Sequence, residues 1–281
     1  MTFGYSRQAY YKHQKLEGLR CVRDQKVLTE VRNIRKEQPK VGGRKLHIML
    51  SNLEQADLKI GRDYLFEMLA QNNLLIKRRL RFTRTTDSGC KPVTYPNLMK
   101  MIGIEKVNQA WVVDITYINT CSGFAYLYLI TDRYSRKIMS HVLADSLKAK
   151  HACSALLKAI STINNPEGII HHSDHGSQYC SDAYQNILKA NNMLCSMTGA
   201  ARCYDNAVAE RINGILKQEL GLGMTIPSLK IARELADNAI YIYNNKRLHA
   251  SLKYKTPSLV YHEGTKYQHI GGINSMFGDV G

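Results

Sequence analysis

Three consecutive runs of β-branched and aromatic residues constrain the fold of this chain more than any other feature. They cover residues 111–118, 124–131 and 137–143, and the short segment Cys121, Ser122, Gly123 separates the first two like a turn. Such runs predict three consecutive strands in a meander. The pattern then predicts a helix over 146–163, a fourth strand over 168–172 and helices over 181–191 and 207–220. This order of elements indicates a mixed α/β domain.

A helical pattern occupies the part of the chain that precedes this domain. Residues 6–36 contain good helix formers and almost no Gly or Pro, and Ser6 is the expected N-cap. After a break at 38–43, apolar residues recur at helical spacing over 46–53 and again over 58–69. Two short amphipathic helices are what a helix-turn-helix requires, although the spacing alone fits a plain helical hairpin equally well.

The charge of the chain is large and unevenly placed. The 281 residues include 39 Lys and Arg against 23 Asp and Glu, a formal charge of +16, and residues 1–100 contribute 21 and 9 of them. A basic segment of this size favours a polyanion such as nucleic acid, because each neutralised phosphate releases counterions. A plain solvated surface is the weaker alternative. An anionic membrane fits less well, since no continuous apolar face accompanies the basic residues.

Composition narrows the class of protein further. A hydrophobic content of 44% with 22% charged residues is ordinary for a globular chain. No apolar run approaches the ~20 residues of a membrane span, and the N-terminus lacks the apolar core of a signal peptide. The seven cysteines contain no C-x-x-C pair. We therefore expect a cytoplasmic protein with no membrane partner and no disulfide framework.

Three carboxylates lie at positions that favour a catalytic or metal-binding role. Asp114 interrupts the first apolar run, where an ionised carboxylate is costly unless it is paired or binds a metal. Asp174 follows the fourth predicted strand in a Gly-containing loop, and strand ends are where α/β sheets place ligands. Glu210 lies just inside a predicted helix. Taken singly, each also fits an ordinary role as a hydrogen-bonding, turn or exposed helix residue.

One face of the helix that carries Glu210 is polar. Asn206, Glu210, Asn213 and Lys217 are spaced by four, three and four residues, so they share this face, and the apolar residues fall largely on the other. The spacing predicts that the polar face is directed at a particular site.

The combination of these elements resembles a known family. An Asp in the first meander strand, an Asp after the fourth strand and a Glu on a later helix resemble the integrase core of DDE transposases and retroviral integrases. The segments HHSDHGSQYCS, CYDNAVAERINGILKQEL and YNNKRLHASLKYKTPSLVYH look like signatures of bacterial transposases of the insertion sequence three family, which are encoded over two reading frames. The resemblance covers residues 38–262.

The resemblance implies a fold and a domain order. The expected fold is an RNase H-like α/β catalytic core, a mixed five-stranded sheet with flanking helices, preceded by an all-α helix-turn-helix-type DNA-binding region. The expected parts are an N-terminal helical segment (1–37), a helix-turn-helix-like domain (38–84), a linker (85–108), the catalytic core (109–263) and a flexible tail (264–281).

The resemblance also implies an activity, cofactors and partners. Asp114, Asp174 and Glu210 would be the catalytic, metal-binding triad for two Mg²⁺ ions, for which Mn²⁺ could substitute. Water would first release a 3′-hydroxyl at the end of a mobile element, and this hydroxyl would then attack a target phosphodiester. The partners would be double-stranded DNA, as the terminal inverted repeats and the target, and at least one further copy of the chain. Contacts to DNA are expected from Lys217, Asn206, Asn213, Arg44, Lys45, Arg62, Lys77, Arg78, Arg79, Arg81, Arg84 and Arg247.

Some features favour other interpretations. The second helix of the predicted pair carries Asp63 and Glu67 with only one basic residue, which argues against base readout by this helix. The neighbouring arginine cluster is then expected to supply mostly phosphate contacts. The histidines at 171, 172 and 175 suggest zinc, but adjacent residues of a strand point to opposite faces. Two other functions stay open: a non-catalytic DNA-binding regulator of a longer frameshifted transposase, and a plain RNase H-type nuclease.

Overall fold

The computed structural model describes residues 6–76, 95–100, 102–198 and 207–276, with side chains as far as Lys266. The chain divides into two compact units, residues 1–84 and 85–281. Each unit has its own hydrophobic core, so each is described by itself.

A single long helix opens the first unit. Helix α1 (Arg7–Glu37) begins at the predicted N-cap, where the Ser6 hydroxyl accepts a hydrogen bond from the N–H of Ala9 at 3.2 Å. Only its C-terminal part is buried, at Val27, Leu28 and Val31. The helix therefore packs into the unit over its last third, because the apolar spacing that a core requires is confined to that part.

The two predicted amphipathic helices follow α1. They are α2 (Gly43–Ser51) and α3 (Arg62–Gln71), and the short 3₁₀ helix η1 (Ala56–Leu58) lies between them. Their apolar faces meet α1 in one core, in which Leu46, Leu50, Leu65 and Leu69 are fully buried. The expected all-α N-terminal region is confirmed.

The second unit is built on a mixed five-stranded sheet in the order β3-β2-β1-β4-β5. Strands β1 (Ala110–Thr120), β2 (Gly123–Asp132) and β3 (Ile138–Ala144) form the predicted antiparallel meander. Strands β4 (Ile170–Ser173) and β5 (Leu194–Met197) run parallel to β1. This is the RNase H-like topology that the resemblance implies, and the expected fold class is confirmed.

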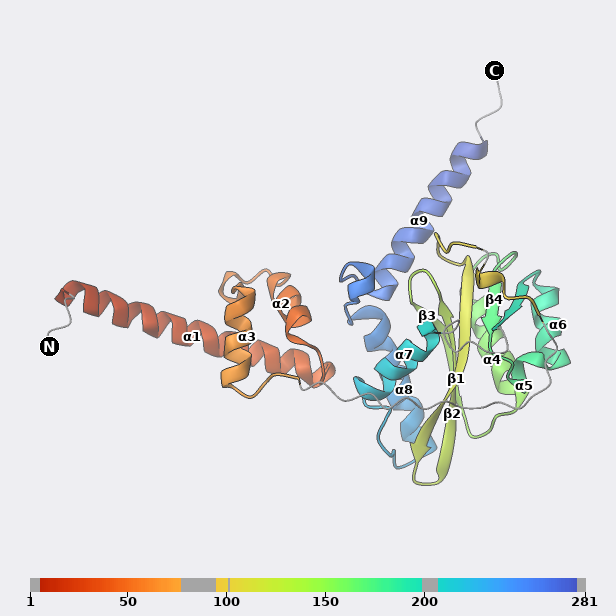
Figure 1. Cartoon of the computed structure of the whole chain (residues 1–281), viewed down its shortest axis with the longest axis horizontal. Coiled ribbons are helices and arrows are strands. Elements are labelled where there is room, and N and C mark those ends of the chain that lie inside the picture. The colour runs from red at the N-terminus through yellow and green to blue at the C-terminus, as the bar shows by residue number, and fades with distance from the viewer. Residues whose placement is uncertain (1–5, 77–94, 101, 199–206, 277–281) are drawn as a thin grey trace, which may run out of the picture. The chain divides into compact units, whose positions relative to one another are not determined.

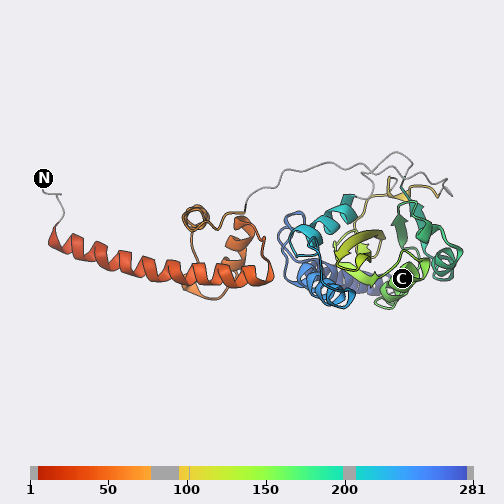
Figure 2. The ribbon, with the colours of Figure 1, turned by 90° about the horizontal axis from the view of Figure 1, so that it is seen from below.

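Helices cover both faces of this sheet (Figures 1 and 2). One face carries α4 (Ala149–Ile160), α5 (Ser177–Cys180) and α6 (Asp182–Ala190). The other carries α7 (Ala207–Gln218) and α8 (Leu229–Asn245). The described part of the unit also contains the 3₁₀ helices η2 (Leu98–Lys100) and η4 (Ala250–Leu252) and the helix α9 (Pro257–Met276).

Alternation along β1 assigns its side chains to the two faces. Trp111 and Val113 belong to the core under α4 and α6, and Ile118 belongs to the core under α7 and α8. Asp114 therefore points to the face that α7 covers. Successive side chains of any strand point to opposite faces of the sheet. The orientation of Asp114 therefore places its carboxylate beside α7.

Two of the expected segments contain residues that the structure describes in more detail. Val107 is fully buried in the core of the second unit, and the Leu98 N–H donates to the Ser196 hydroxyl at 3.0 Å. The later part of the expected linker therefore packs as part of the second unit. Helix α9 extends to Met276 and so includes much of the segment expected as a tail. No proline follows Pro257 to end this helix earlier.

Among the described residues, none of the helices combines the length and the apolar character that a membrane crossing requires.

Candidate active site

Asp114 lies near the middle of β1, opposite Leu129 of β2. Its side chain is partly buried, and both of its carboxylate oxygens accept hydrogen bonds. Oδ1 accepts from the N–H of Ile115 at 2.9 Å, and Oδ2 accepts from the side-chain amide of Asn213 at 2.6 Å. These two donors hold the carboxylate in one orientation on the α7 face of the sheet.

Asp174 directly follows the carboxyl end of β4. The parallel register pairs Trp111 with His171 and Val112 with His172, so two further residues along each chain bring position 174 level with 114. Asp174 is exposed, and its Oδ1 accepts from the N–H of Gly176 at 2.9 Å. A Cβ at position 176 would lie 3.0 Å from this oxygen, so the turn favours glycine there.

Glu210 lies in the first turn of α7, which packs on β1. The helix buries Ala209, Ile212, Ile215 and Leu216 on its inner face and leaves Glu210 exposed. Asn213 follows one turn later and reaches Asp114, and Lys217 lies a further turn along. The predicted polar face of this helix therefore meets the strand that carries Asp114.

The charges of these side chains act on one another. Burial raises the pKa of Asp114 to about 7, and the negative charges of Asp174 and, less strongly, Glu210 also raise it. The Ile115 N–H and the Lys217 ammonium oppose this shift. Burial in turn lowers the pKa of Lys217, against the effect of the Asp114 charge. The fold thus holds three acids within electrostatic range despite their repulsion.

The donor set matches a hard divalent cation better than a soft one. Carboxylate oxygens are the ligands that Mg²⁺ prefers, and a cation would relieve the repulsion that raises the pKa of Asp114. In the conformation described here, no three His, Cys, Asp or Glu side chains of the described residues converge as a finished metal cluster. The chemistry of the site fits Mg²⁺, while its geometry would have to tighten around the ion.

The histidines of β4 are engaged in the core. His171 Nε2 lies 2.7 Å from the Tyr184 hydroxyl, and His172 Nδ1 lies 2.9 Å from the Ser196 hydroxyl. Both rings are buried, and burial lowers the pKa of His171 to about 3. His175 Nε2 is 2.6 Å from the carbonyl of Thr198. The three rings therefore face three different partners, which gives them structural roles.

The structure gives two of the expected DNA contacts another role. Asn213 is only 9% exposed and bonds to Asp114, so it supports the carboxylate. Arg247 is 5% exposed, and its guanidinium donates two-pronged hydrogen bonds to Glu219 at 2.8–3.0 Å. In this conformation the guanidinium of Arg247 is bonded to Glu219 and is not open to a phosphate. Spacing along the helix could not reveal either partner, because both come from distant parts of the chain.

The other expected contacts are distributed over both units. Arg44 and Lys45 lie in the first turn of α2, and Arg62 begins α3, where it donates to Asp63 at 2.8 Å. Lys217 is partly buried on α7. The remaining six lie outside the described residues: Asn206, Lys77, Arg78, Arg79, Arg81 and Arg84.

Comparisons with known proteins place these features in a family. The integrase core domain family matches residues 105–203, and a second integrase core domain family matches residues 191–257. Among solved structures, the HTLV-2 integrase catalytic core in complex with magnesium is 22% identical, covers 55% of this chain and 97% of its own, and has a TM-score of 0.45.

Two of three bacterial relatives match most of the chain. The uncharacterized 31 kDa protein of insertion element IS600 from Shigella sonnei is 30% identical over 265 residues, 92% of this chain and 95% of that protein. The transposase of IS629 from Shigella sonnei is 29% identical over 90% of this chain and 85% of its own. Transposase InsF of IS3A from Escherichia coli is 38% identical over 144 residues, 51% of this chain and 50% of its own. The chain belongs to the IS3 family of insertion-sequence transposases, with an integrase core domain.

Proposed function

We propose that this transposase binds double-stranded DNA at the ends of its element, cleaves a strand there and joins the resulting 3′-hydroxyl to a target phosphodiester. The observation that carries the proposal is the position of Asp114. Its carboxylate is held by two donors in the middle of the sheet, and the charges of Asp174 and Glu210 act on it. An acid whose pKa is strongly raised by burial and by neighbouring charges is a candidate for a functional site.

Each side chain has a distinct part in this proposal. Asp114, Asp174 and Glu210 would hold two Mg²⁺ ions, for which Mn²⁺ could substitute; bound there, the metal supplies activation of the attacking oxygen and stabilisation of the leaving oxygen. Asn213 keeps the carboxylate of Asp114 turned toward α7. Lys217, two turns beyond Glu210, would balance the charge of a phosphate brought next to the acids.

The N-terminal unit would supply many of the contacts to DNA. Arg44 and Lys45 lie in the first turn of α2, where helix N–H groups and basic side chains together attract phosphate. Arg62 is at the start of α3, and the basic run 77–84 continues the charge. Because two element ends must be brought together, we propose that at least two copies of the chain act on DNA.

A strand-transfer assay tests this function. Incubation of the protein with labelled end-containing duplex and Mg²⁺ should release a 3′-hydroxyl product and then a joined DNA product, and EDTA should prevent both. Glu210→Gln should remove both products, whereas Glu234→Gln, on an exposed position of α8, should leave them unchanged. Equal products from the Glu210→Gln protein would refute the catalytic assignment. DNA binding without any product would favour the non-catalytic regulator instead, and cleavage of RNA in hybrids would favour a nuclease.

Asn213→Ala should raise the Mg²⁺ concentration needed for half-maximal cleavage about 10- to 100-fold, the effect expected when a group that orients a metal ligand is removed. Removing the amide leaves Oδ2 of Asp114 without its donor. A Mg²⁺ titration of the cleavage rate measures this, together with the affinity for DNA. A loss of DNA affinity with unchanged Mg²⁺ dependence would return Asn213 to the direct DNA contact that its sequence position suggests.

Replacement of the five basic residues between 77 and 84 by Gln should weaken DNA binding and make it less dependent on salt. For each phosphate contact that is lost, the slope of the logarithm of the DNA association constant against the logarithm of the salt concentration should become about 0.9 less negative. Affinity measured between 50 and 200 mM salt, a range over which several phosphate contacts have a large effect, checks the expectation. An unchanged slope would show that this run does not lie along phosphates.

A further inference from the structure

Four side chains near the end of the β1–β2 hairpin form a surface that the proposed chemistry does not use. Tyr117 pairs with Tyr126 and Asn119 pairs with Phe124, and directly opposite residues of an antiparallel pair lie on the same face of the sheet. The end of the hairpin extends beyond α4, α5 and α6, which cover this face nearer the middle of the sheet (Figure 1). These four residues are called the hairpin platform below.

The three rings of the hairpin platform are apolar groups that the core leaves partly exposed. Tyr117 is 49% exposed and Phe124 is 61% exposed, while Tyr126 packs against the core and is partly buried. Tyr117 meets both other rings edge to face, with centroid distances of 5.9 Å to Phe124 and 5.3 Å to Tyr126. This packing orients the rings and leaves parts of their faces open to another flat group.

The exposed area of the platform is too small for a stable protein interface. An aromatic side chain presents about 150–250 Å², so three rings at these exposures present roughly 300 Å² in total. A stable interface needs about 800 Å² from each partner, and the exposed residues beyond the rings include the polar Asn119 and Ser122. The area instead matches one or two nucleobases, which stack on aromatic side chains whatever the base sequence.

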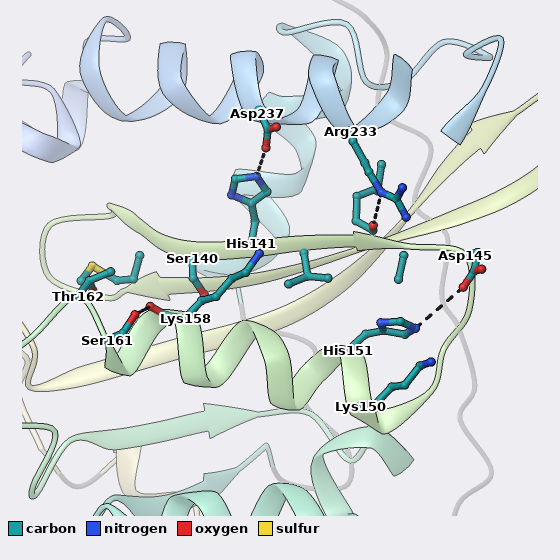
Figure 3. Close-up of a pocket in the computed structure, with 14 residues that line it drawn as sticks. Ser140, His141, Asp145, Lys150, His151, Lys158, Ser161, Thr162, Arg233 and Asp237 are labelled. Carbon is teal, nitrogen blue, oxygen red and sulfur yellow. Dashed lines mark hydrogen bonds and ion pairs between the residues drawn. The ribbon is translucent and has the colours of Figure 1, made fainter. Parts of the chain in front are cut away.

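The charge beside the platform suits a nucleic acid strand. Segment 145–150 follows the end of β3 that pairs with Tyr126, and its two lysines, both exposed, and one aspartate leave it a net charge of +1. The aspartate, Asp145, lies 3.9 Å from His151 of α4, and the ammonium of Lys150 also acts on it (Figure 3). Stacking surfaces flanked by positive charge are how proteins hold single strands of nucleic acid.

The platform lies a few nucleotides from the position of the proposed cleavage. Tyr117 is three residues and Asn119 five residues beyond Asp114 on β1, which corresponds to about 10 Å and 17 Å along the strand. Successive nucleotides of one DNA strand rise about 3.4 Å, so these distances equal about three to five nucleotides. Positions 114 and 117 point to opposite faces of the sheet, so a base reaches the rings only after it has left the duplex. Since β4 ends at Ser173, only β2 among the described strands pairs with β1 over residues 114–118, and the base would pass on the other side.

We propose that the hairpin platform takes up one or two unpaired bases of the DNA strand, about three to five nucleotides from the cleaved phosphodiester. This inference rests on the proposed function, because that function places the phosphodiester at Asp114. The bases stack on Tyr117 and Phe124, and the exposed amide of Asn119 offers donors and an acceptor to the edge of a stacked base. Stacking offsets part of the free energy that unpairing costs, so the duplex opens beside the cut.

Single abasic sites in an end-containing duplex test the proposal. Binding of the full chain is measured in EDTA by fluorescence anisotropy, with one base removed at a time on either side of the cut. At one or two positions, about three to five nucleotides from the cut, the affinity should fall about 5- to 150-fold, which is the contribution of one stacked base. Abasic sites at the other positions should change the affinity much less.

Removal of the rings should cost the same affinity as removal of the base, and the two losses should not add. The double variant Tyr117→Ala, Phe124→Ala should bind the intact duplex as weakly as the native chain binds the abasic one, and the abasic site should cost it nothing further. The double variant Tyr117→Phe, Phe124→Tyr keeps both rings and should retain the native affinity and the abasic penalty. Tyr241→Ala, at a tyrosine of α8 that is 55% exposed, is the matched control and should also retain both.

Two results would overturn the proposal. One is an abasic penalty that is the same in the native chain and in the alanine double variant, or no position-dependent penalty at all. The other is a smaller mass of the alanine variant by light scattering with its abasic penalty unchanged, which would assign the platform to a second copy of the chain. Asp114→Asn should keep the penalty in EDTA, so loss of catalysis leaves this inference standing, whereas normal strand transfer without any penalty refutes this inference alone.

Discussion

Asp114→Asn should reduce Mg²⁺-dependent strand cleavage by at least about 10³-fold, equivalent to about 4 kcal/mol of transition-state stabilisation. The substitution keeps the size of the side chain but removes the negative charge that a divalent ion requires. A cleavage time course at saturating Mg²⁺ measures the effect, with Glu234→Gln as a control for loss of a carboxylate at an exposed site. Cleavage within about tenfold of the native rate would remove Asp114 from the triad.

The same substitution should make the metal-free protein more stable at pH 8. The pKa of Asp114 is raised from 3.8 to about 7 in the folded chain, so the folded state loses stability as the pH rises from about 4 to 7. The loss approaches 4 kcal/mol at most, since each pKa unit corresponds to about 1.4 kcal/mol. Asparagine cannot accept at both positions that Ile115 and Asn213 occupy, and the absence of one hydrogen bond leaves a net gain of about 2 kcal/mol.

Urea unfolding in EDTA at pH 5 and pH 8 measures this gain. The Asp114→Asn protein should show a smaller fall in unfolding free energy between the two pH values than the native chain. Addition of Mg²⁺ at pH 8 should stabilise the native chain and leave the variant unchanged, because binding to the folded state alone raises its stability. An identical pH dependence in both proteins would contradict the electrostatic description of the site.

Arg247→Ala should lower the unfolding free energy by about 3 to 5 kcal/mol, because it removes the hydrogen-bonded partner of the partly buried Glu219 and leaves only the more distant Arg211 beside it. The guanidinium is 5% exposed and donates three hydrogen bonds to the two oxygens of this carboxylate. DNA affinity of the folded fraction should be unchanged, since the side chain does not reach the surface.

Arg211→Ala is the matched control for Arg247. Its guanidinium approaches the same Glu219 at 3.6 Å, but its side chain is 57% exposed, so its loss should change stability by at most about 1 kcal/mol. Urea unfolding of the two variants gives the comparison, and salt-dependent DNA binding tests the surface role. Equal stability losses, or a loss of DNA affinity confined to Arg247→Ala, would contradict the buried ion pair.

The element order of the second unit was predictable because it rests on local patterns. The meander of β1, β2 and β3 follows from β-branched runs separated by a short turn, and the structure places each strand within two residues of the predicted bounds. β5 had no comparable pattern: Leu194–Met197 is four residues long, and only its last two are buried. Its place in the sheet came from the family resemblance alone.

For the polar residues of the site, too, local features were predictable and distant contacts were not. Helical spacing correctly grouped Glu210, Asn213 and Lys217 on one face, because residues three and four apart share a face in any helix. It could not say that Asn213 would meet Asp114, which is 99 positions away in the chain. Whether Asn213 also contacts DNA stays a prediction, which the Mg²⁺ titration of the Asn213→Ala protein tests.

The basic residues show why charge in the sequence does not predict which side chains are free to bind a partner. Arg247 and Lys150 look alike in the sequence, yet one is buried against Glu219 and the other is exposed on α4. Charge counts report how many cations a chain carries, whereas pairing depends on which distant acids the fold brings near.

The order of helices and strands, and the presence of one acid on each of three elements, could thus be read from the amino-acid sequence, since periodicity and residue type act over a few neighbouring positions. The tertiary structure decided the rest: the register that brings position 174 level with 114, the amide that holds Asp114, and which cations are buried. These features arise from contacts between segments far apart in the chain, and burial, which sets both pairing and pKa, exists only once those segments have packed.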